Sequence, residues 1–140
     1  MAAQGRHERE GVRAELIPAG IGTAFRLATC PNDGWTFATR AAAFLASFFR
    51  VHPFVDGNGR VGRLFVKKIC RKERMGIRSW TLTTNDRRQY IRALELAHEA
   101  HDKGQETKLS VVELQRWIEV RAYPLVDDSE LNAADDDTLV

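Results

Sequence analysis

Several features of secreted and membrane proteins are scarce in this chain of 140 residues. It has two cysteines, Cys30 and Cys70, which are too few for a disulfide framework and suit the core better. No run of about 20 apolar residues is present, so the sequence predicts no membrane-spanning helix. Residues 1–15 are charged and lack the apolar segment of a signal peptide. We therefore expect a cytoplasmic protein with reduced thiols and no membrane partner.

The end of the chain lacks basic residues. Residues 124–140 contain six of the 19 acidic residues and no Lys or Arg. The other 13 acidic residues share residues 1–123 with all 21 basic ones. The body is therefore basic, which suits a ligand that carries phosphate. The composition of the tail is typical of disorder. We do not expect a nucleic-acid partner, because no recognition motif accompanies the basic residues.

Apolar spacing predicts one mainly α-helical domain over residues 12–123, between a disordered N-terminus, residues 1–11, and the acidic tail, residues 124–140. Apolar side chains recur every three or four positions in each helical segment. Ser110 and Glu113 fit a capping box at the start of the last helix. Gly76, Gly104 and Pro124 are expected to end helices. The helices are predicted at residues 37–51, 59–75, 86–103 and 110–123.

Residues 12–30 follow a different pattern. Two short apolar–polar runs flank a cluster of Pro18, Gly20 and Gly22. Such a cluster between short runs indicates a β-hairpin. The expected fold is thus mainly α with a small β-hairpin near its start.

The most informative stretch is residues 52–63, His-Pro-Phe-Val-Asp-Gly-Asn-Gly-Arg-Val-Gly-Arg. Arg60 and Arg63 lie three positions apart, so they share a face of a helix that begins near Gly59. Cations are disfavoured in a first turn, because the helix N-terminus carries partial positive charge. Two arginines at this place indicate that an anion binds there.

The glycines fit the same ligand. Gly57 and Gly59 can take a positive φ without a steric penalty. Alternating glycines let backbone N–H groups form a nest for an anion, and the following helix adds its dipole. The sequence therefore predicts a phosphate site. It is not a Walker loop, because the Lys-Ser/Thr ending and a preceding strand are missing.

Two side chains beside this nest are candidates for a metal ligand and a general base. Asp56 offers carboxylate oxygens, and Mg²⁺ typically takes one or two protein carboxylates together with phosphate oxygens and water. Pro53 favours a helix end near His52, whose imidazole has an ordinary pKa near ~6.5 and is a candidate general base. The alternatives are a loop-capping role for Asp56 and a structural role for His52.

The stretch resembles the signature of the Fic family, His-Pro-Phe-x-Asp/Glu-Gly-Asn-Gly/Lys-Arg-x-x-Arg, at all nine defined positions. The resemblance extends from about Ala14 to Tyr123 and includes residues 88–94, which follow the motif. It implies a mainly helical fold whose members transfer AMP from ATP to a protein hydroxyl. The partner would be a target protein with a hydroxyl side chain.

The resemblance also implies residue roles. His52 would deprotonate the target Ser, Thr or Tyr, whose oxygen attacks the α-phosphorus and releases pyrophosphate. Asp56 would hold Mg²⁺, and Arg60 and Arg63 would neutralise the β- and γ-phosphates. The phosphates would be cradled by Gly57, Asn58 and Gly59.

Three further residues receive roles in the same way. The predicted hairpin, with Thr23 and Arg26, resembles a flap that docks the target by strand addition. Tyr90 would line the adenine pocket, with a core position as the alternative.

Several points stay open on sequence alone. Gly59 favours AMP transfer, whereas the Doc-like branch has Lys there and phosphorylates. AMP removal and a non-catalytic nucleotide-binding domain are further alternatives. Many relatives carry an inhibitory Ser/Thr-x-x-x-Glu-Gly/Asn motif, but Arg6 stands where Glu10-Gly11 would need Ser or Thr. The activity is then unrestrained, restrained by a separate inhibitory partner, or restrained by the acidic tail reaching Arg63. A homodimer is a further alternative for the assembly of the protein.

Overall fold

The computed structural model describes residues 16–29, 34–51, 58–78 and 83–126. Within these ranges the chain is mainly α-helical, as predicted, with one small antiparallel sheet. None of the helices described is long and apolar enough to cross a membrane. The elements are α1 (Ile17–Thr29), α2 (Phe37–Val51), α3 (Asn58–Lys72), β1 (Met75–Ile77), α4 (Thr84–Asp102), α5 (Thr107–Ser110), α6 (Val112–Arg121) and β2 (Ala122–Pro124).

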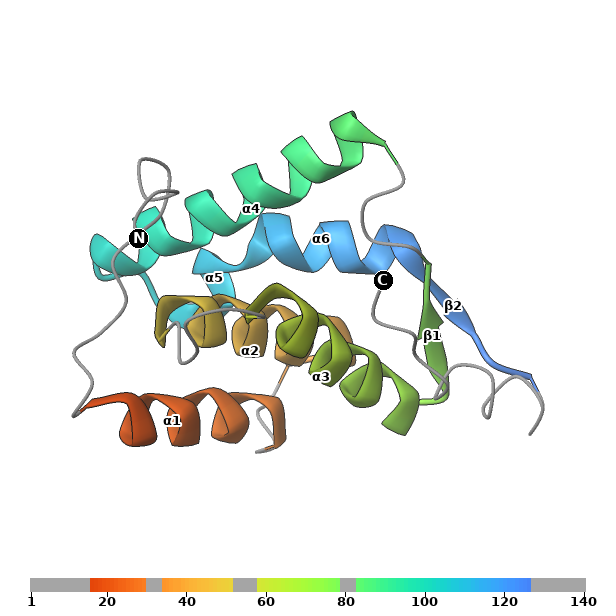
Figure 1. Ribbon diagram of the computed structural model, residues 1–140, viewed down its shortest axis with the longest axis horizontal. Coiled ribbons are helices and arrows are strands. Elements are labelled where there is room, and N and C mark those ends of the chain that lie inside the picture. The colour runs from red at the N-terminus through yellow and green to blue at the C-terminus, as the bar shows by residue number, and fades with distance from the viewer. Residues whose placement is uncertain (1–15, 30–33, 52–57, 79–82, 127–140) are drawn as a thin grey trace.

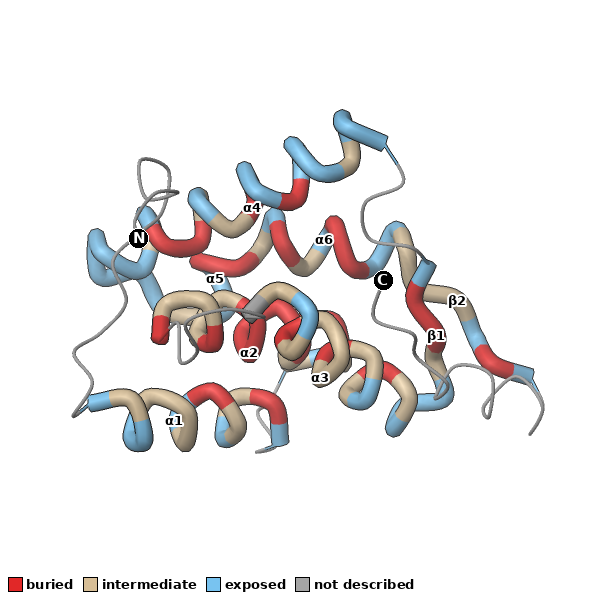
Figure 2. Tube along the Cα trace, viewed as in Figure 1, coloured by how far each residue is buried: buried red, intermediate tan, exposed pale blue. Residues whose placement is uncertain are grey.

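Helix α2 is the centre of the fold. It packs against α1, α3, α4, α5 and α6, and Figure 1 shows it between α1 on one side and α4 and α6 on the other. Figure 2 shows that α2 and the facing side of α6 are buried. The small side chains of α2 let its neighbours approach closely, while its larger ones fill the space between them. The buried residues of α2 are Ala38, Thr39, Ala41, Ala42, Ala43, Phe44, Leu45, Phe48 and Val51.

Aromatic rings join the first three helices. The ring of Phe44, which is fully buried, lies 5.4 Å from that of Phe25 in α1 and 5.8 Å from that of Phe65 in α3, between centroids. Phe48 stacks on Phe44 at 5.4 Å. Tilted and stacked pairs at these distances add to the free energy of burial. The pairing therefore fixes where α1 and α3 lie on α2.

Buried polar groups tie α2 to the later helices. The Thr39 hydroxyl donates a hydrogen bond of 3.1 Å to Oε1 of Gln115 in α6. His98 of α4, which is buried, is hydrogen-bonded through Nε2 to the carbonyl oxygen of Ala46 at 3.0 Å. These contacts specify one arrangement of the helices, because a buried polar group without a partner is costly.

Helix α3 buries Cys70, whose predicted role is to fill the core. Cys70 and Val66 have no exposed surface. Burial raises the pKa of the Cys70 thiol to about 12. A thiol held protonated in this way is unreactive at neutral pH, so the predicted core role of Cys70 is confirmed.

The hairpin predicted over residues 12–30 is wrong where the structure describes it, because residues 17–29 form helix α1. Pro18 is tolerated in the first turn of a helix. Gly20 serves close packing, since a Cβ added there would lie 2.6 Å from Cγ2 of Val51. Ala24 and Ala28, four residues apart, face the core. Gly20, which resembles a turn residue, is thus a contact point between α1 and α2.

The two strands lie elsewhere in the chain. β1 and β2 pair antiparallel, with Met75 opposite Pro124 and Ile77 opposite Ala122. The chain leaves α3 through Arg74, whose φ of 59° is left-handed, so α3 ends earlier than predicted. Gly76 lies in β1 rather than ending a helix, and a Cβ there would lie 2.5 Å from Cζ of Tyr123. The sheet joins the ends of α3 and α6.

Helix starts were predicted with mixed success. The helix predicted at residues 37–51 is confirmed, and α4 starts two residues before the predicted position, with a capping box between Thr83 and Asp86. The capping box predicted at Ser110 is wrong. Ser110 lies in the short helix α5, where its hydroxyl donates to the carbonyl oxygen of Thr107. Gly104 follows α4 with a φ of 83°, as its predicted stop requires.

Phe44→Ala should lower the free energy of unfolding by about 3–5 kcal/mol, because it removes the ring that three helices share and leaves a cavity. Urea unfolding followed by circular dichroism measures the loss. The matched control is Val120→Ala, whose side chain is on the surface and should change the value by less than about 0.5 kcal/mol. Equal losses in the two variants would contradict the central role of Phe44.

Candidate functional site

The predicted phosphate site lies at the start of α3. The helix begins at Asn58, one residue before the predicted start, and its first turn contains no acidic residue. The backbone N–H groups of a first turn have no partner within the helix and carry partial positive charge. With Arg60 in the same turn, this end of α3 is an electropositive terminus suited to an anion.

The two arginines of the motif differ in exposure. Arg60 is exposed, whereas Arg63 is half-buried. A Cβ added to Gly59 would lie 3.1 Å from Nη1 of Arg63, so the guanidinium folds back along α3 over the glycine. A side chain at position 59 would require that group to shift by a few tenths of an ångström. Among the described residues, no carboxylate pairs with either arginine.

Tyr90 of α4 lies within the electrostatic reach of Arg63. Its ring packs 5.1 Å from that of Trp117 in α6, between centroids, and only 6% of the residue is exposed. Burial raises the pKa of the phenol, and the charge of Arg63 opposes this in part. The alternative core position for Tyr90 fits this burial, and its adenine role remains a prediction.

Three predicted site residues, His52, Asp56 and Gly57, lie outside the described residues. The elements around them are described, since α2 reaches Val51 and α3 begins at Asn58. The chain between them therefore starts at the end of the most buried helix and ends at the electropositive terminus. Within the described ranges, no group of three or more His, Cys, Asp or Glu side chains could hold a metal ion.

Thr23 and Arg26, predicted on a docking flap, lie on the exposed side of α1. Nη2 of Arg26 donates to the Thr23 hydroxyl at 3.0 Å, and that hydroxyl donates to the carbonyl oxygen of Ala19 at 3.1 Å. A helix uses its backbone hydrogen bonds internally, so this segment cannot take up a target by strand addition. The predicted strand conformation is thus wrong for residues 17–29, whereas target docking by Thr23 and Arg26 stays a prediction.

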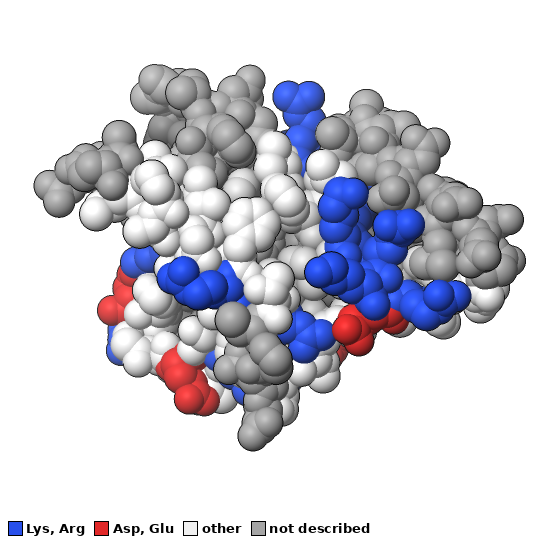
Figure 3. All heavy atoms as spheres, turned by 90° about the horizontal axis from the view of Figure 1, so that it is seen from below, with Lys and Arg blue, Asp and Glu red and all other residues white. Residues whose placement is uncertain are grey.

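The sequence did not single out a second candidate site. A cavity between α1, α2 and α3 is lined by apolar side chains and by Lys68 and Lys72. Figure 3 shows Lys and Arg gathered on the side of the molecule where α3 ends. From the sequence, the run of basic residues within 67–74 indicates only a solvated helix face. The available signal was the four-residue spacing of the two lysines, which places both on one face of α3 with Phe65 and Ile69.

Comparisons with known proteins agree with the motif. Residues 4–70 match the model of the Fic/DOC family. This span covers α1, α2, nearly all of α3 and the motif. A Fido domain-containing protein of Dictyostelium discoideum is 36% identical over 67 residues, which cover 48% of this chain and 46% of that protein. The match thus spans about half of its length. No solved structure matches.

An electropositive helix start after a glycine-rich motif is an arrangement suited to a ligand that carries phosphate. Residues 4–70, slightly less than half of this chain, are thus similar to the Fic/DOC family. Members of that family are generally transferases.

The buried phenol of Tyr90 gives a pH-dependent prediction. An unfolded Tyr loses its proton near pH ~10, whereas burial keeps Tyr90 protonated in the folded protein at a higher pH. The unfolded state then binds fewer protons, so stability falls as the pH rises above about 10. When the pH is raised from 9 to 11, the free energy of unfolding measured in urea should fall by about 1.4 kcal/mol more for the wild-type protein than for Tyr90→Phe. Equal losses would show that Tyr90 titrates normally.

Proposed function

We propose that this protein transfers AMP from ATP to a hydroxyl group of a target protein. The observation that carries the proposal is the start of α3, where Arg60 and Arg63 lie at a helix N-terminus without an acidic residue in its first turn. That arrangement favours a polyphosphate. The Fic/DOC family match over residues 4–70 supports the same reaction class.

The chemistry follows from the motif. The target hydroxyl oxygen forms a bond to the α-phosphorus of ATP, the bond from that phosphorus to the bridging oxygen breaks, and pyrophosphate leaves. His52 takes the hydroxyl proton as a general base, which typically contributes ~10²–10⁴-fold. Arg63, held against Gly59, neutralises the charge that develops on the leaving pyrophosphate. The remaining rate acceleration comes from the orientation of the phosphates at the start of the helix.

Mg²⁺ fits this site as a companion of the phosphates. A single protein carboxylate suffices for that mode of binding, since phosphate oxygens and water complete the coordination. Asp56 would hold the ion. When bound, the ion would neutralise part of the phosphate charge.

The reaction is tested with ATP labelled at the α- or the γ-phosphate, incubated with Mg²⁺, the protein and cell lysate. Label should pass from α-labelled ATP to protein and fall by ~10²–10⁴-fold in His52→Ala. Transfer from γ-labelled ATP alone would establish phosphorylation and refute AMP transfer. No transfer from either, with ATP still bound, would favour a nucleotide-binding domain.

Arg63→Ala should reduce AMP transfer by on the order of 10²-fold, because a preorganised charge on the phosphates is lost. The matched control is Arg116→Ala, which removes an exposed arginine of α6 that pairs with Glu113 at 3.0 Å. The control should keep full activity. Initial rates at saturating ATP measure both variants. Equal activities of Arg63→Ala and the wild type would remove Arg63 from the site.

A further inference from the structure

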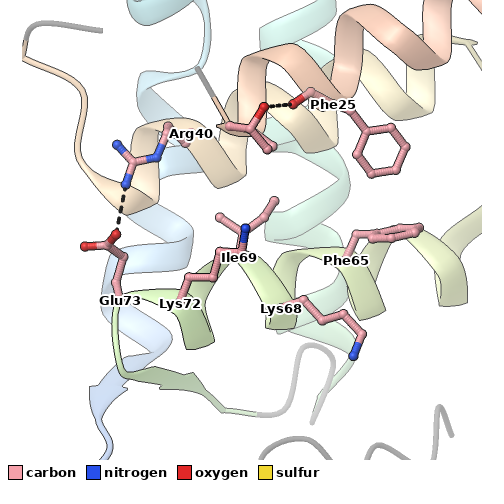
Figure 4. Close-up of a pocket in the computed structure, with 9 residues that line it drawn as sticks. Phe25, Arg40, Phe65, Lys68, Ile69, Lys72 and Glu73 are labelled. Carbon is pink, nitrogen blue, oxygen red and sulfur yellow. Dashed lines mark hydrogen bonds and ion pairs between the residues drawn. The ribbon is translucent and has the colours of Figure 1, made fainter. Parts of the chain in front are cut away.

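The second half of α3 and the strand β1 that follows it carry charge of mostly one sign. Residues 64–78 contain six basic residues and one acidic residue, Glu73. Glu73 pairs with Arg40 of α2 at 3.4 Å, and Figure 4 shows its carboxylate turned toward that arginine. A hollow of about 410 Å³ at the end of α3 is lined by four basic residues, called here the basic surface: Lys68, Arg71, Lys72 and Arg74. Because basic residues outnumber acidic ones so strongly in this segment, the basic surface suits an acidic ligand.

The later helices are balanced in charge. Helix α4 contains four acidic residues and three arginines, and α6 contains two acidic residues and two arginines. On α4, Arg92 lies 3.5 Å from Glu95 and 3.7 Å from Glu99. On α6, Arg116 pairs with Glu113 at 3.0 Å. These helices therefore attract an acidic segment less than α3 does.

The small sheet brings the acidic tail to the basic surface. The N–H group of Leu125, directly after β2, donates a hydrogen bond of 2.8 Å to the carbonyl oxygen of Arg74. Leu125 is buried, whereas Val126 is exposed. Residues 127–140 hold all six acidic residues of the tail and lie outside the described residues. This acidic segment therefore begins two residues after a direct contact with the basic surface.

From these contacts we propose that residues 127–140 bind the basic surface at the end of α3 of the same chain. A segment of this length spans up to about 50 Å when extended, and the start of α3 lies about 21 Å from its end along the helix axis. Both ends of α3 are thus within reach. Nearness favours the basic surface, because the effective concentration of a linked segment falls as the connecting chain lengthens.

Binding of this segment has a consequence for ligand choice. Exposed Lys and Arg side chains attract nucleic acid and other polyanions without sequence preference. Residues 127–140 cover the basic surface and leave the start of α3 to a ligand that carries phosphate. This inference does not depend on AMP transfer, and none of the experiments below uses ATP.

A zero-length carbodiimide cross-linker tests the contact, because it joins a carboxylate to a lysine only where the two touch. Trypsin releases residues 122–140 as one peptide, since this stretch has no Lys or Arg. In the cross-linked monomer, mass spectrometry should find this peptide joined to the α3 segment that contains Lys68 and Lys72. The links should become rare in 1 M salt, where charges are screened beyond about 3 Å.

Lys103 and Lys108 are the matched controls for cross-linking. Both are exposed, and they lie after α4 and in α5. Figure 1 shows that α4 ends on the side of the molecule away from the sheet. Their links to the tail should be roughly tenfold rarer. Equal linking of the controls and of α3 would overturn the proposal. Links found only between two chains would assign the basic surface to the tail of a second copy and overturn it as well.

A charge variant tests the covering of the basic surface. Asp127→Asn with Asp128→Asn and Glu130→Gln should raise the rate at which an activated acetyl ester modifies Lys72 by about threefold, and should not change the rate at Lys103. The matched control removes three exposed carboxylates outside the tail, with Glu95→Gln, Glu99→Gln and Glu106→Gln. It should leave the rate at Lys72 unchanged. Equal rises in the two variants would reduce the effect to overall charge and overturn the proposal.

The same tail variant should bind a single-stranded oligonucleotide at least about tenfold more tightly than the wild type at low salt. Adding Lys72→Gln and Arg74→Gln to the tail variant should abolish this gain, whereas adding Lys103→Gln and Lys108→Gln should not. Equal binding by the wild type and the tail variant would show that residues 127–140 do not cover the basic surface.

Discussion

The burial of α2 is the constraint on which the rest of the structure depends. This helix contacts all five other helices, and its Phe44 ring is shared with α1 and α3. Because its small side chains let neighbouring helices approach, the position of each neighbour is set by close contact rather than by loops. The C-terminal end of α2 and the N-terminal end of α3 are held by this packing, and the proposed catalytic motif joins those two ends. A rigid scaffold is what a site for in-line transfer needs, since small misplacements are costly in rate.

Glycine has two different roles around this scaffold. Gly20 allows α1 to approach Val51, and Gly62 places α3 where a Cβ would lie 3.2 Å from the Phe49 ring. Gly59 instead makes room for a functional group, the Arg63 guanidinium. The same residue type therefore builds the core in two places and shapes the proposed phosphate site in a third.

Both ends of α3 carry positive charge. Its first turn combines Arg60 with the positive helix end, which suits a polyphosphate, and its last turn carries Arg71 and Lys72 beside the negative helix end. The family match covers residues 52–63 completely and ends at residue 70.

The sequence by itself determined the helix at residues 37–51, the start of α3 and the residue types of the phosphate motif, because these depend on periodicity and on neighbouring residues. It gave the wrong structure for residues 17–29, where Pro and Gly resemble a turn but serve a helix packed on α2. It also missed the Thr83 and Asp86 capping box and the cavity beside Lys68. Only tertiary structure decided these features, because close approach at Gly20, the pairing of β1 with β2 and a cavity between three helices arise from contacts between segments far apart in the chain.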